Sequence, residues 1–350
     1  MKKKILILFF LILTLFSVFF FFFSYSFLAV SNPVKSNIIL IEAWISANEL
    51  EQIIDDNLTP EIKQILIVGK TKGKPFFDAT SPPSDWNYTN DLHQPKDNKG
   101  VYLWANSSLI IDPAKYPAIN PIDSLHVQVK ASGSIAKKRF SFFNLIINGK
   151  YHASAFTSNT LKTYDFTTLL QDEKLQSVIL QFDNDLKTKK EDRNLFIYSI
   201  IINGHEIVIN NQNATIIRNG NRMPTGFVSN AELRANYLQA IGINKTRIQT
   251  ISYQPSEYNK TLSSAKALDK YARQAILSSF NIFTSGIHAR RTWFTYKKIL
   301  GKGFSIGIIS LKTNNFNKQN WWKSKEGILM MIDEIISYLA NWIKLTFYIK

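Results

Sequence analysis

Cysteine is absent from this chain of 350 residues, which excludes disulfide bridges and zinc sites built from thiolates. The sequence also has no Gly-x-Ser-x-Gly elbow joining a strand to a helix, so no covalent mechanism is indicated. Acidic side chains are scarce, because 26 Asp and Glu residues stand against 42 Lys and Arg, a net charge of +16.

One long apolar run occupies the N-terminus. Lys2, Lys3 and Lys4 precede residues 5–23, in which only a threonine and a serine are polar. A helix of that length rises about 28 Å, close to the hydrocarbon thickness of a bilayer. We therefore expect an uncleaved transmembrane anchor over residues 1–30, single-pass, with the N-terminus cytoplasmic and the bulk of the chain extracytoplasmic. A cleaved signal peptide is the alternative.

The positive charge is unevenly distributed. Residues 222–350 hold 19 Lys and Arg against 6 Asp and Glu, whereas residues 79–221 hold 15 against 13. Such a break indicates two units with different partners. The basic unit suits membrane lipid with anionic headgroups or an anionic glycan carrier, and a lysine-rich composition bias explains it equally well. We expect no nucleic-acid partner, because an extracytoplasmic domain seldom meets one.

Strands alternate with helices in two separate stretches of the chain. Buried-strand patterns are found at 37–44, 64–69, 247–253, 280–286 and 304–310. The last helix carries one apolar face, made of Ile328, Met331, Ile332, Ile335, Ile336, Leu339, Trp342 and Ile343. We predict an α/β domain with a doubly wound, mostly parallel sheet of about five strands, formed by residues 36–78 plus 222–350.

The stretch between these two pieces has another rhythm. It contains short strand patterns without helical spacing, and Asn148-Gly149 and Asn203-Gly204 each stand between apolar runs. Asn-Gly is a strong hairpin signal, because both central residues of the turn need a positive φ. We predict that residues 80–216 form an antiparallel β-sandwich inserted into a loop of the α/β domain.

An oxygen-rich segment, QFDNDLKTKKEDRN, spans residues 181–194. Asp183 and Asp185 have the spacing for a glycosidase carboxylate pair, although the sequence shows no evident partner that would raise the pKa of one of them. A solvated turn is the second interpretation. The third is a calcium site, since calcium takes six to eight oxygen ligands from carboxylates, amides and the backbone.

The segment FDNDLKTKKEDRNLFIYSIIING resembles the closing signature of the calcium-dependent, xylan-binding type of carbohydrate-binding module. The matching positions are Asn184, Asp185, Glu191, Asp192, Arg193, Asn194, Leu195, Asn203 and Gly204. The resemblance implies a Ca²⁺ ion that coordinates sugar hydroxyls directly, with a polysaccharide as partner, xylan-like or another envelope glycan. The expected metal ligands are Asp183, Asn184, Asp185, Glu191, Asp192 and Asn194.

The α/β pieces resemble the YdcF/SanA-like (ElyC-type) family of membrane-anchored α/β proteins of uncertain activity. The resemblance is carried by LIEAW (40–44), ILIVG (65–69), AELRANYLQAIGI (231–243), YNKTLSSAKAL (258–268), TSGIHARRTWFTYKKILG (284–301) and WWKSKEGI (321–328).

In an open parallel sheet, ligands bind beyond the carboxyl ends of the strands. Candidate catalytic residues there are Glu42, His288 and Arg290. Candidate anion-binding residues are Lys70, Thr261, Ser285 and Arg291. A helix-capping histidine with two solvated arginines explains the 288–291 segment equally well. No reaction is identified by the sequence.

The sequence thus predicts a membrane-anchored envelope protein that binds polysaccharide through a calcium-dependent sandwich module. The alternative is an enzyme whose α/β domain acts on a phosphorylated or anionic envelope glycan or lipid intermediate. The oligomeric state is not predicted.

Overall fold

The computed structural model describes residues 21, 23–71, 88–89, 100–113, 124–170, 174–207, 209, 214–218, 226–254, 260–313 and 316–348. Contacts divide the chain into two compact units. We call residues 1–45, 49–71 and 244–350 the α/β unit, and residues 46–48 and 72–243 the sandwich unit.

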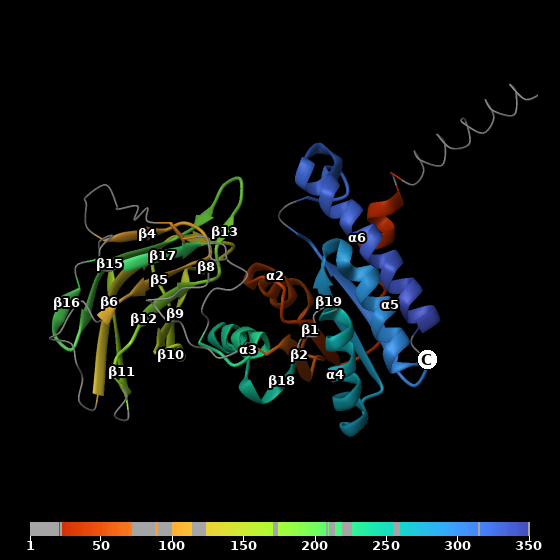
Figure 1. Ribbon diagram of the computed structural model, residues 1–350, viewed down its shortest axis with the longest axis horizontal. Helices are drawn as coiled ribbons and strands as arrows, with labels where there is room; N and C mark the ends of the chain where they lie inside the picture. The colour runs from red at the N-terminus through yellow and green to blue at the C-terminus, as the bar shows by residue number, and fades with distance from the viewer. Residues whose placement is uncertain are drawn as a thin grey trace, which may run out of the picture. The chain divides into compact units, whose positions relative to one another are not determined.

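A parallel five-stranded sheet forms the centre of the α/β unit (Figure 1). Its strands are β1 (Ile38–Glu42), β2 (Gln64–Lys70), β18 (Ile248–Tyr253), β19 (Ser279–Ser285) and β20 (Ser305–Leu311). Their order is β18-β2-β1-β19-β20, so the direction of the strand order reverses between β1 and β19. The prediction of a parallel sheet of about five strands is confirmed, and this reversal defines its topological switch point.

The helices of the α/β unit follow its strands. They are η1 (Ile53–Asn57), α4 (Lys260–Gln274), η5 (Gly286–His288), α5 (Ala289–Leu300), η6 (Trp321–Lys323), α6 (Lys325–Ile343) and η7 (Lys344–Tyr348), with η4 (Lys245–Arg247) directly before β18 and α2 (Ala47–Gln52) divided between the two units. Strand residues such as Leu40 and Ile282 form one apolar core with Leu268 of α4 and Tyr296 of α5. Helices α4 and α5 therefore cover one face of the sheet.

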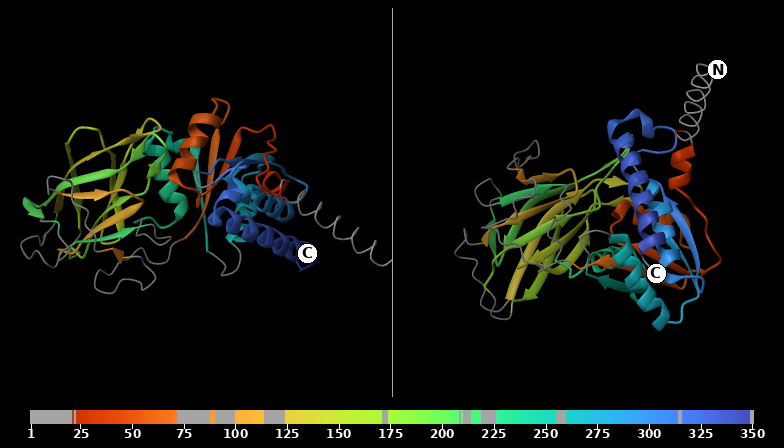
Figure 2. Two further views of the ribbon diagram at one scale, coloured as in Figure 1. Left: turned by 90° about the horizontal axis from the view of Figure 1, so that it is seen from above. Right: turned by 45° about the vertical axis from the view of Figure 1, so that its right-hand side comes forward.

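Helix α6 packs on α5, on the side of α5 away from the sheet (Figures 1 and 2). Its inward face carries Met331 together with two polar residues, Glu334 and Asn341, all three of them buried. Most of the large apolar residues of the stripe predicted from the sequence are exposed instead. Within α6 the polar contacts are therefore inside and the apolar stripe is outside.

In the part of the chain that the structure describes, no helix is long and apolar enough to cross a membrane. The predicted anchor lies mostly outside this part, because residues 1–20 and 22 are not among the described residues. Residues 23–28 are helical, and Leu28 is buried in a cluster with Phe316, Trp321 and Met331.

Two antiparallel sheets form the sandwich unit. The first has the order β10-β9-β12-β5-β17-β3: β10 (Lys150–Phe156), β9 (Phe142–Ile147), β12 (Val178–Phe182), β5 (Ser107–Ile111), β17 (Ala214–Arg218) and β3 (Tyr88–Thr89). The second has β11 (Lys162–Leu169), β6 (Ser124–Gly133), β15 (Leu195–Ile202) and β16 (His205–Ile207), with β4 (Val101–Leu103) paired to β15. Two short ribbons add β7 (Ile135–Ala136) with β8 (Arg139–Phe140), and β13 (Leu186–Lys187) with β14 (Asp192–Arg193).

Alternating side chains of both sheets fill the space between them. Val127 and Ile200 of the second sheet share one core with Leu145 and Leu180 of the first. The antiparallel β-sandwich predicted from the sequence is therefore confirmed.

Both predicted Asn-Gly hairpins are present. Asn148 and Gly149 have φ values of 49° and 72° between β9 and β10, and Asn203 and Gly204 have 48° and 81° between β15 and β16. Positive φ at both central residues is the geometry of a tight hairpin turn that matches the strand twist.

Helix α3 (Asn230–Ala240) begins at Ser229, whose side chain accepts a hydrogen bond from Glu232 N as an N-cap. The domain boundaries predicted from sequence assign this helix to the α/β domain. In the structure it groups with the sandwich unit, where the Tyr237 ring lies 5.2 Å from Phe142 and Asn236 Nδ2 donates to Asn144 Oδ1 at 3.2 Å. The buried side of a helix, and not its place in an alternating βα pattern, decides which unit it joins.

Candidate functional site

The oxygen-rich segment folds as the ribbon of β13 and β14, in which Leu186 pairs with Arg193 and Lys187 pairs with Asp192. Leu186 and Arg193 are buried, so their side of the ribbon faces the protein. Side chains alternate between the two faces of a strand. Continuing the register by one position sets Asp185 opposite Asn194, on the same face as Asp192.

These three residues share an unusual feature. Asp185 Oδ1, Asp192 Oδ1 and Asn194 Oδ1 are buried side-chain oxygens that have no hydrogen-bond partner among the described residues. Burial, followed by the charge of Asp192, raises the pKa of Asp185 to about 6. Burial and then the same two carboxylates raise the pKa of Tyr102, whose ring stacks on Phe196 at 5.0 Å. The ribbon thus presents a small cluster of oxygens beside an aromatic pair.

Two neighbours of this cluster hold the loop in shape. Arg193 is fully buried and donates to three backbone carbonyls, those of Arg139 (3.0 Å), Asn184 (2.8 Å) and Ala136. The Asn184 side chain accepts from Phe142 N at 2.8 Å and donates to the Phe140 carbonyl at 3.0 Å. The amide of Asn184, one of the predicted ligands, is therefore engaged with the backbone of the β8–β9 segment.

The other two predicted ligands lie in separate contacts. Asp183 Oδ2 pairs with Arg234 Nη1 of α3 at 3.2 Å. Glu191 is exposed, and its Oε2 accepts from Lys137 N at 3.0 Å. Of the six predicted ligands, the ribbon brings together the oxygens of Asp185, Asp192 and Asn194.

The described residues contain no cluster of three or more His, Cys, Asp and Glu side chains arranged for a metal ion. The ribbon cluster has two carboxylates and one amide oxygen, all of them hard oxygen ligands. Calcium prefers such ligands. Asp185 and Asp192 are half-buried like charges, each with one buried oxygen without a hydrogen-bond partner among the described residues, and a cation stabilises such a pair. Lys187 Nζ lies 3.8 Å from the other oxygen of Asp192 and is the exposed positive charge nearest this pair in the ribbon. The residues present therefore fit Ca²⁺.

The sandwich unit also contains a cavity of about 230 Å³. It is lined by Leu125, Val127, Leu145, Ile147, His152, Ala153, Asp165, Phe166, Thr167 and Thr168. Leu125 and Val127 are near the start of β6, whereas Gly133 at its end pairs with Leu195, next to Asn194. The cavity and the oxygen cluster therefore lie toward opposite ends of β6.

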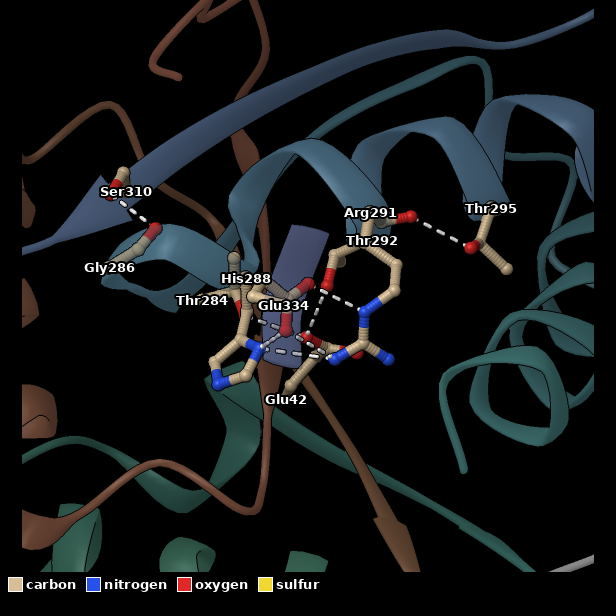
Figure 3. Close-up of polar contacts among 9 residues, drawn as sticks. All are labelled: Glu42, Thr284, Gly286, His288, Arg291, Thr292, Thr295, Ser310 and Glu334. Atoms are coloured by element: carbon tan, nitrogen blue, oxygen red, sulfur yellow. Dashed lines mark hydrogen bonds and ion pairs between the residues drawn. The ribbon is translucent and has the colours of Figure 1, made fainter. Parts of the chain in front are cut away.

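A second candidate site occupies the carboxyl edge of the parallel sheet, at the switch point between β1 and β19 (Figure 3). Glu42 ends β1 and is 1% exposed. Its Oε2 accepts hydrogen bonds from Thr284 Oγ1 (2.8 Å) and Thr292 Oγ1 (3.1 Å), while Oε1 is buried without a hydrogen-bond partner among the described residues. Burial raises the pKa of Glu42. Burial also raises the pKa values of half-buried Tyr253 and fully buried Tyr296, and the charge of Glu42 raises both further.

Beside Glu42, three residues form one ionic group (Figure 3). Glu334 of α6 accepts from Arg291 through Oε1 (2.6 Å) and Oε2 (2.9 Å), and its Oε2 lies 2.5 Å from His288 Nδ1. Burial acts to raise the pKa of Glu334, but its bonds to His288 and Arg291 hold that pKa below the ordinary value. Because a carboxylate only accepts hydrogen bonds, the short contact assigns the proton to Nδ1. Arg291 Nη2 lies 3.1 Å from the same nitrogen and then donates to Glu334 Oε2 alone. This assignment leaves Nε2 as the acceptor of the neutral ring.

The structure separates the two arginines that the sequence analysis assigned to this edge. Arg291 joins His288 and Glu334, whereas Arg290 Nε donates to the Phe27 carbonyl at 2.9 Å and its guanidinium lies 4.6 Å from the Phe27 ring. The remaining predicted residues are Ser285 at the end of β19, Lys70 at the end of β2 and Thr261 in the first turn of α4. All three come from the carboxyl edge of the sheet.

The letters of the serine-hydrolase pattern do occur, at Gly303-Phe304-Ser305-Ile306-Gly307. Ser305 begins β20, and its backbone N donates to the Ser278 carbonyl at the amino edge of the sheet. A nucleophile elbow needs the serine at a turn from a strand into a helix. This serine is therefore on the wrong edge for a nucleophile acting with His288.

Sequence reasoning placed Thr284 at the carboxyl edge of the sheet without giving it a role, and it did not find Glu334, Thr292 or Tyr102. Glu334 carries the one usable signal, because it breaks the apolar pattern of the last helix on the face opposite the apolar stripe. Thr292 in a helix pattern and Tyr102 in a strand pattern carry no signal of their own.

Comparison with protein families finds a match within the sandwich unit. Residues 126–217 match the family model of the calcium-dependent, xylan-binding carbohydrate-binding module. This region of the sandwich unit is similar to such a module. The match includes all six predicted ligands and both strands of the ribbon, and it supports polysaccharide binding by the module. No curated protein matches the chain.

Solved structures give distant similarities only. A family two carbohydrate esterase from Cellvibrio japonicus is 8% identical with a TM-score of 0.22, over 73% of this chain and 97% of that one. An acetyl xylan esterase from Butyrivibrio proteoclasticus is 10% identical with a TM-score of 0.23, over 75% and 77%. A family two carbohydrate esterase from Clostridium thermocellum in complex with cellohexaose is 8% identical with a TM-score of 0.24, over 75% and 85%. At these scores the similarities carry no conclusion about this chain.

Proposed function

We propose that this protein is a membrane-anchored polysaccharide-binding protein of the cell envelope, and that its carbohydrate-binding module holds glycan through calcium. The N-terminal apolar run would be the anchor, with the lysines at its start on the cytoplasmic side and the bulk of the chain outside. The proposal for the second unit is a YdcF/SanA-like α/β domain, as the sequence resemblance implies.

One observation supports calcium most directly: three buried oxygens without partners, from Asp185, Asp192 and Asn194, share one face of the β13–β14 ribbon. These residues would hold the ion. When bound, calcium would supply open coordination positions for sugar hydroxyls, which are hard oxygen ligands.

The chain's own residues would add to the specificity of the site. The stacked rings of Tyr102 and Phe196 stand beside the carboxylates and offer an apolar face to a sugar ring. Arg193 and Asn184 would keep the loop in the shape that brings Asp185 and Asn194 together. The identity of the glycan would follow from how its hydroxyls match this arrangement.

Isothermal titration of the full chain in detergent micelles tests the proposal. Xylan, cellulose and mannan oligosaccharides are titrated with calcium present, and again after chelation with EGTA. We expect xylan-type binding that requires calcium, and loss of calcium uptake in Asp185→Asn and Asp192→Asn. Glu191→Gln is the matched control, because its carboxylate bonds to Lys137 N and lies outside the cluster.

Two results would contradict the proposal. One is glycan binding that survives chelation. The other is glycan binding that is abolished by Thr167→Val and His152→Ala at the cavity but is unaffected by Asp185→Asn, since the cavity is toward the other end of β6.

A second candidate function is catalysis at the switch point of the α/β unit, on a phosphorylated or anionic envelope glycan or lipid intermediate. It is favoured by the buried, unpartnered Glu42 Oε1 and by the His288–Glu334 contact at the same edge of the sheet. Glu42 would hold or move a proton at Oε1, and His288 would accept one at Nε2. Arg291 would position His288 through Glu334.

The test for this candidate is binding and turnover of phosphorylated sugars and polyprenyl phosphates by the full chain. His288→Gln and Glu42→Gln are expected to abolish turnover while glycan binding by the module is unchanged. If no anionic compound shifts the NMR signals of His288, this candidate is rejected without affecting the first.

A further inference from the structure

The outward face of α6 is apolar along its whole length. It exposes Ile328 (38%), Leu329 (54%), Ile332 (49%), Ile336 (61%), Leu339 (50%), Trp342 (41%) and Ile343 (46%), and Phe347 (66%) of η7 continues it. These residues recur every three or four positions and so lie on one side of the helix. We call this surface the α6 face.

The arrangement is the reverse of a surface helix in water. Glu334 and Asn341 are buried and bond to Arg291 and Thr295, whereas the apolar residues of the stripe are exposed. Soluble proteins rarely expose a continuous apolar patch of this extent unless it is a binding site for a membrane or a protein. The α6 face therefore needs an apolar partner.

Contacts of the N-terminal segment indicate which partner this is. The apolar run 5–23 leads directly into residues that pack beside α6: the Phe27 ring lies 5.4 Å from Tyr338, and the Tyr25 ring lies 6.4 Å from Phe316. Phe23 and Phe27 are 55% and 45% exposed. A bilayer that holds the run 5–23 would therefore begin next to α6.

Charge around the α6 face fits the surface of an anionic membrane. Lys323 and Lys325 are exposed at its start and Lys344 at its end, against two exposed acidic residues of the helix, Glu326 and Asp333. The chain from residue 222 onward carries 19 basic against 6 acidic residues. Basic side chains flanking an apolar helical face, with Trp342 near its end, are typical of helices that lie in the interface of a membrane.

We propose that the α6 face lies in the plane of the membrane interface, embedded among the lipids of the bilayer that the N-terminal run enters. This inference rests on the proposed membrane location and deepens it, because it adds a second contact that orients the α/β unit on the bilayer. The carboxyl edge of the sheet is fixed to this surface, since Glu334 of α6 holds His288.

Site-directed spin labelling tests the proposal, and the absence of native cysteine allows single labels in the full chain. Ile332→Cys, Ile336→Cys and Leu339→Cys report on the α6 face, and Leu11→Cys reports on the N-terminal run. Ile276→Cys is the water-exposed control, because Ile276 is 89% exposed in the same unit. The protein is reconstituted into vesicles of phosphatidylglycerol and phosphatidylethanolamine.

We expect the three α6 labels to collide readily with oxygen, which partitions into lipid, and severalfold less than the control with a water-soluble nickel chelate. Nickel accessibility equal to that at Ile276 would overturn the proposal. Protection from both reagents would also overturn it, because a second copy or residues 1–20 would then cover the face. If the label at Leu11 is exposed to water while the α6 labels are exposed to lipid, only the membrane anchor is rejected. If the label at Leu11 is exposed to lipid while the α6 labels are exposed to water, only the contact of the α6 face with the bilayer is rejected.

Discussion

Glu334 Oε2 lies 2.5 Å from His288 Nδ1, so a residue of the last helix fixes the ring at the carboxyl edge of the sheet. The same carboxylate holds both Nε and Nη2 of Arg291. One buried charge thus joins α6 to η5 through His288 and to α5 through Arg291. The geometry of the candidate site therefore depends on how α6 packs.

Glu334→Gln tests the strength of this connection. Arg291 would remain largely buried without its countercharge, and we expect a loss of about 3 kcal/mol in the free energy of unfolding of the α/β unit. Urea unfolding followed by tryptophan fluorescence measures it. Asp333→Asn, an exposed neighbour on the same helix, should change the free energy by no more than about 0.5 kcal/mol. Equal effects of the two substitutions would contradict the assignment.

Glu334 also predicts a dependence of stability on pH. Its pKa is depressed in the folded protein, so its contribution is present above the ordinary pKa of a glutamate and is lost as the pH falls through the folded value. Thermal unfolding of the protein and of Glu334→Gln across acidic pH should give curves that converge at low pH. Curves that stay parallel would show that Glu334 does not titrate in this way.

Glu42 predicts the opposite slope, because burial raises its pKa. Its contribution is fully present below the ordinary pKa of a glutamate and is lost as the pH rises through the folded value. Relative to Glu42→Gln, the protein should therefore lose stability as the pH rises. Thr284→Val removes one hydrogen bond to Oε2 and should move this loss to higher pH. A Glu42→Gln difference that is constant with pH would contradict the prediction.

Arg193→Lys should destabilise the sandwich unit by about 3 kcal/mol, because a lysine ammonium cannot reach three separate backbone carbonyls from a fully buried position. Urea unfolding with a probe in the sandwich unit measures this loss. Lys190→Gln in the same loop is the control, since its side chain is exposed. If Arg193→Lys behaves like Lys190→Gln, the guanidinium does not hold the loop.

Calcium should reverse the effect of Asp192→Asn on stability. Without calcium, this substitution removes a like charge beside Asp185 and should stabilise the protein slightly. With calcium at a hundred times its dissociation constant, the unsubstituted protein should gain about 2.7 kcal/mol, which the variant should not gain. Thermal unfolding of the two proteins in EGTA measures the effect of the substitution itself, and thermal unfolding in calcium measures the stabilisation by the ion. An equal gain in stability from calcium in both proteins would contradict the assignment of Asp192 as a calcium ligand.

The sheets were predictable because their residues give repetitive signals. Buried apolar runs marked β1, β2, β19 and β20, and Asn148 and Asn203 marked two hairpins with their positive φ values. The oxygen cluster was found in part, because Asp185, Asp192 and Asn194 lie in one short segment. Because side chains alternate between the two faces of a strand, the side chain of Arg193 lies on the opposite face from those of Asp192 and Asn194 and is buried.

The sequence could not predict which face of a helix is buried against the protein and which is exposed. The apolar stripe of α6 has the spacing of a core-facing helix, but Ile336 is exposed and Glu334 is buried. Likewise, Arg290 and Arg291 are adjacent and equally basic, and only the packing of Phe27 separates their roles. Contacts between distant parts of the chain decide such cases, and periodicity does not contain them.

The insertion point has a consequence for how the chain folds during synthesis. Ile65 of β2 pairs with Ile248 of β18, although the whole sandwich separates them in sequence. A ribosome therefore releases every strand of the sandwich before the edge strand of the parallel sheet exists. Domains generally fold as units in the order of their synthesis. We expect the sandwich to fold first and the parallel sheet to close last, so that the nascent chain acquires its glycan-binding unit before its α/β unit is complete.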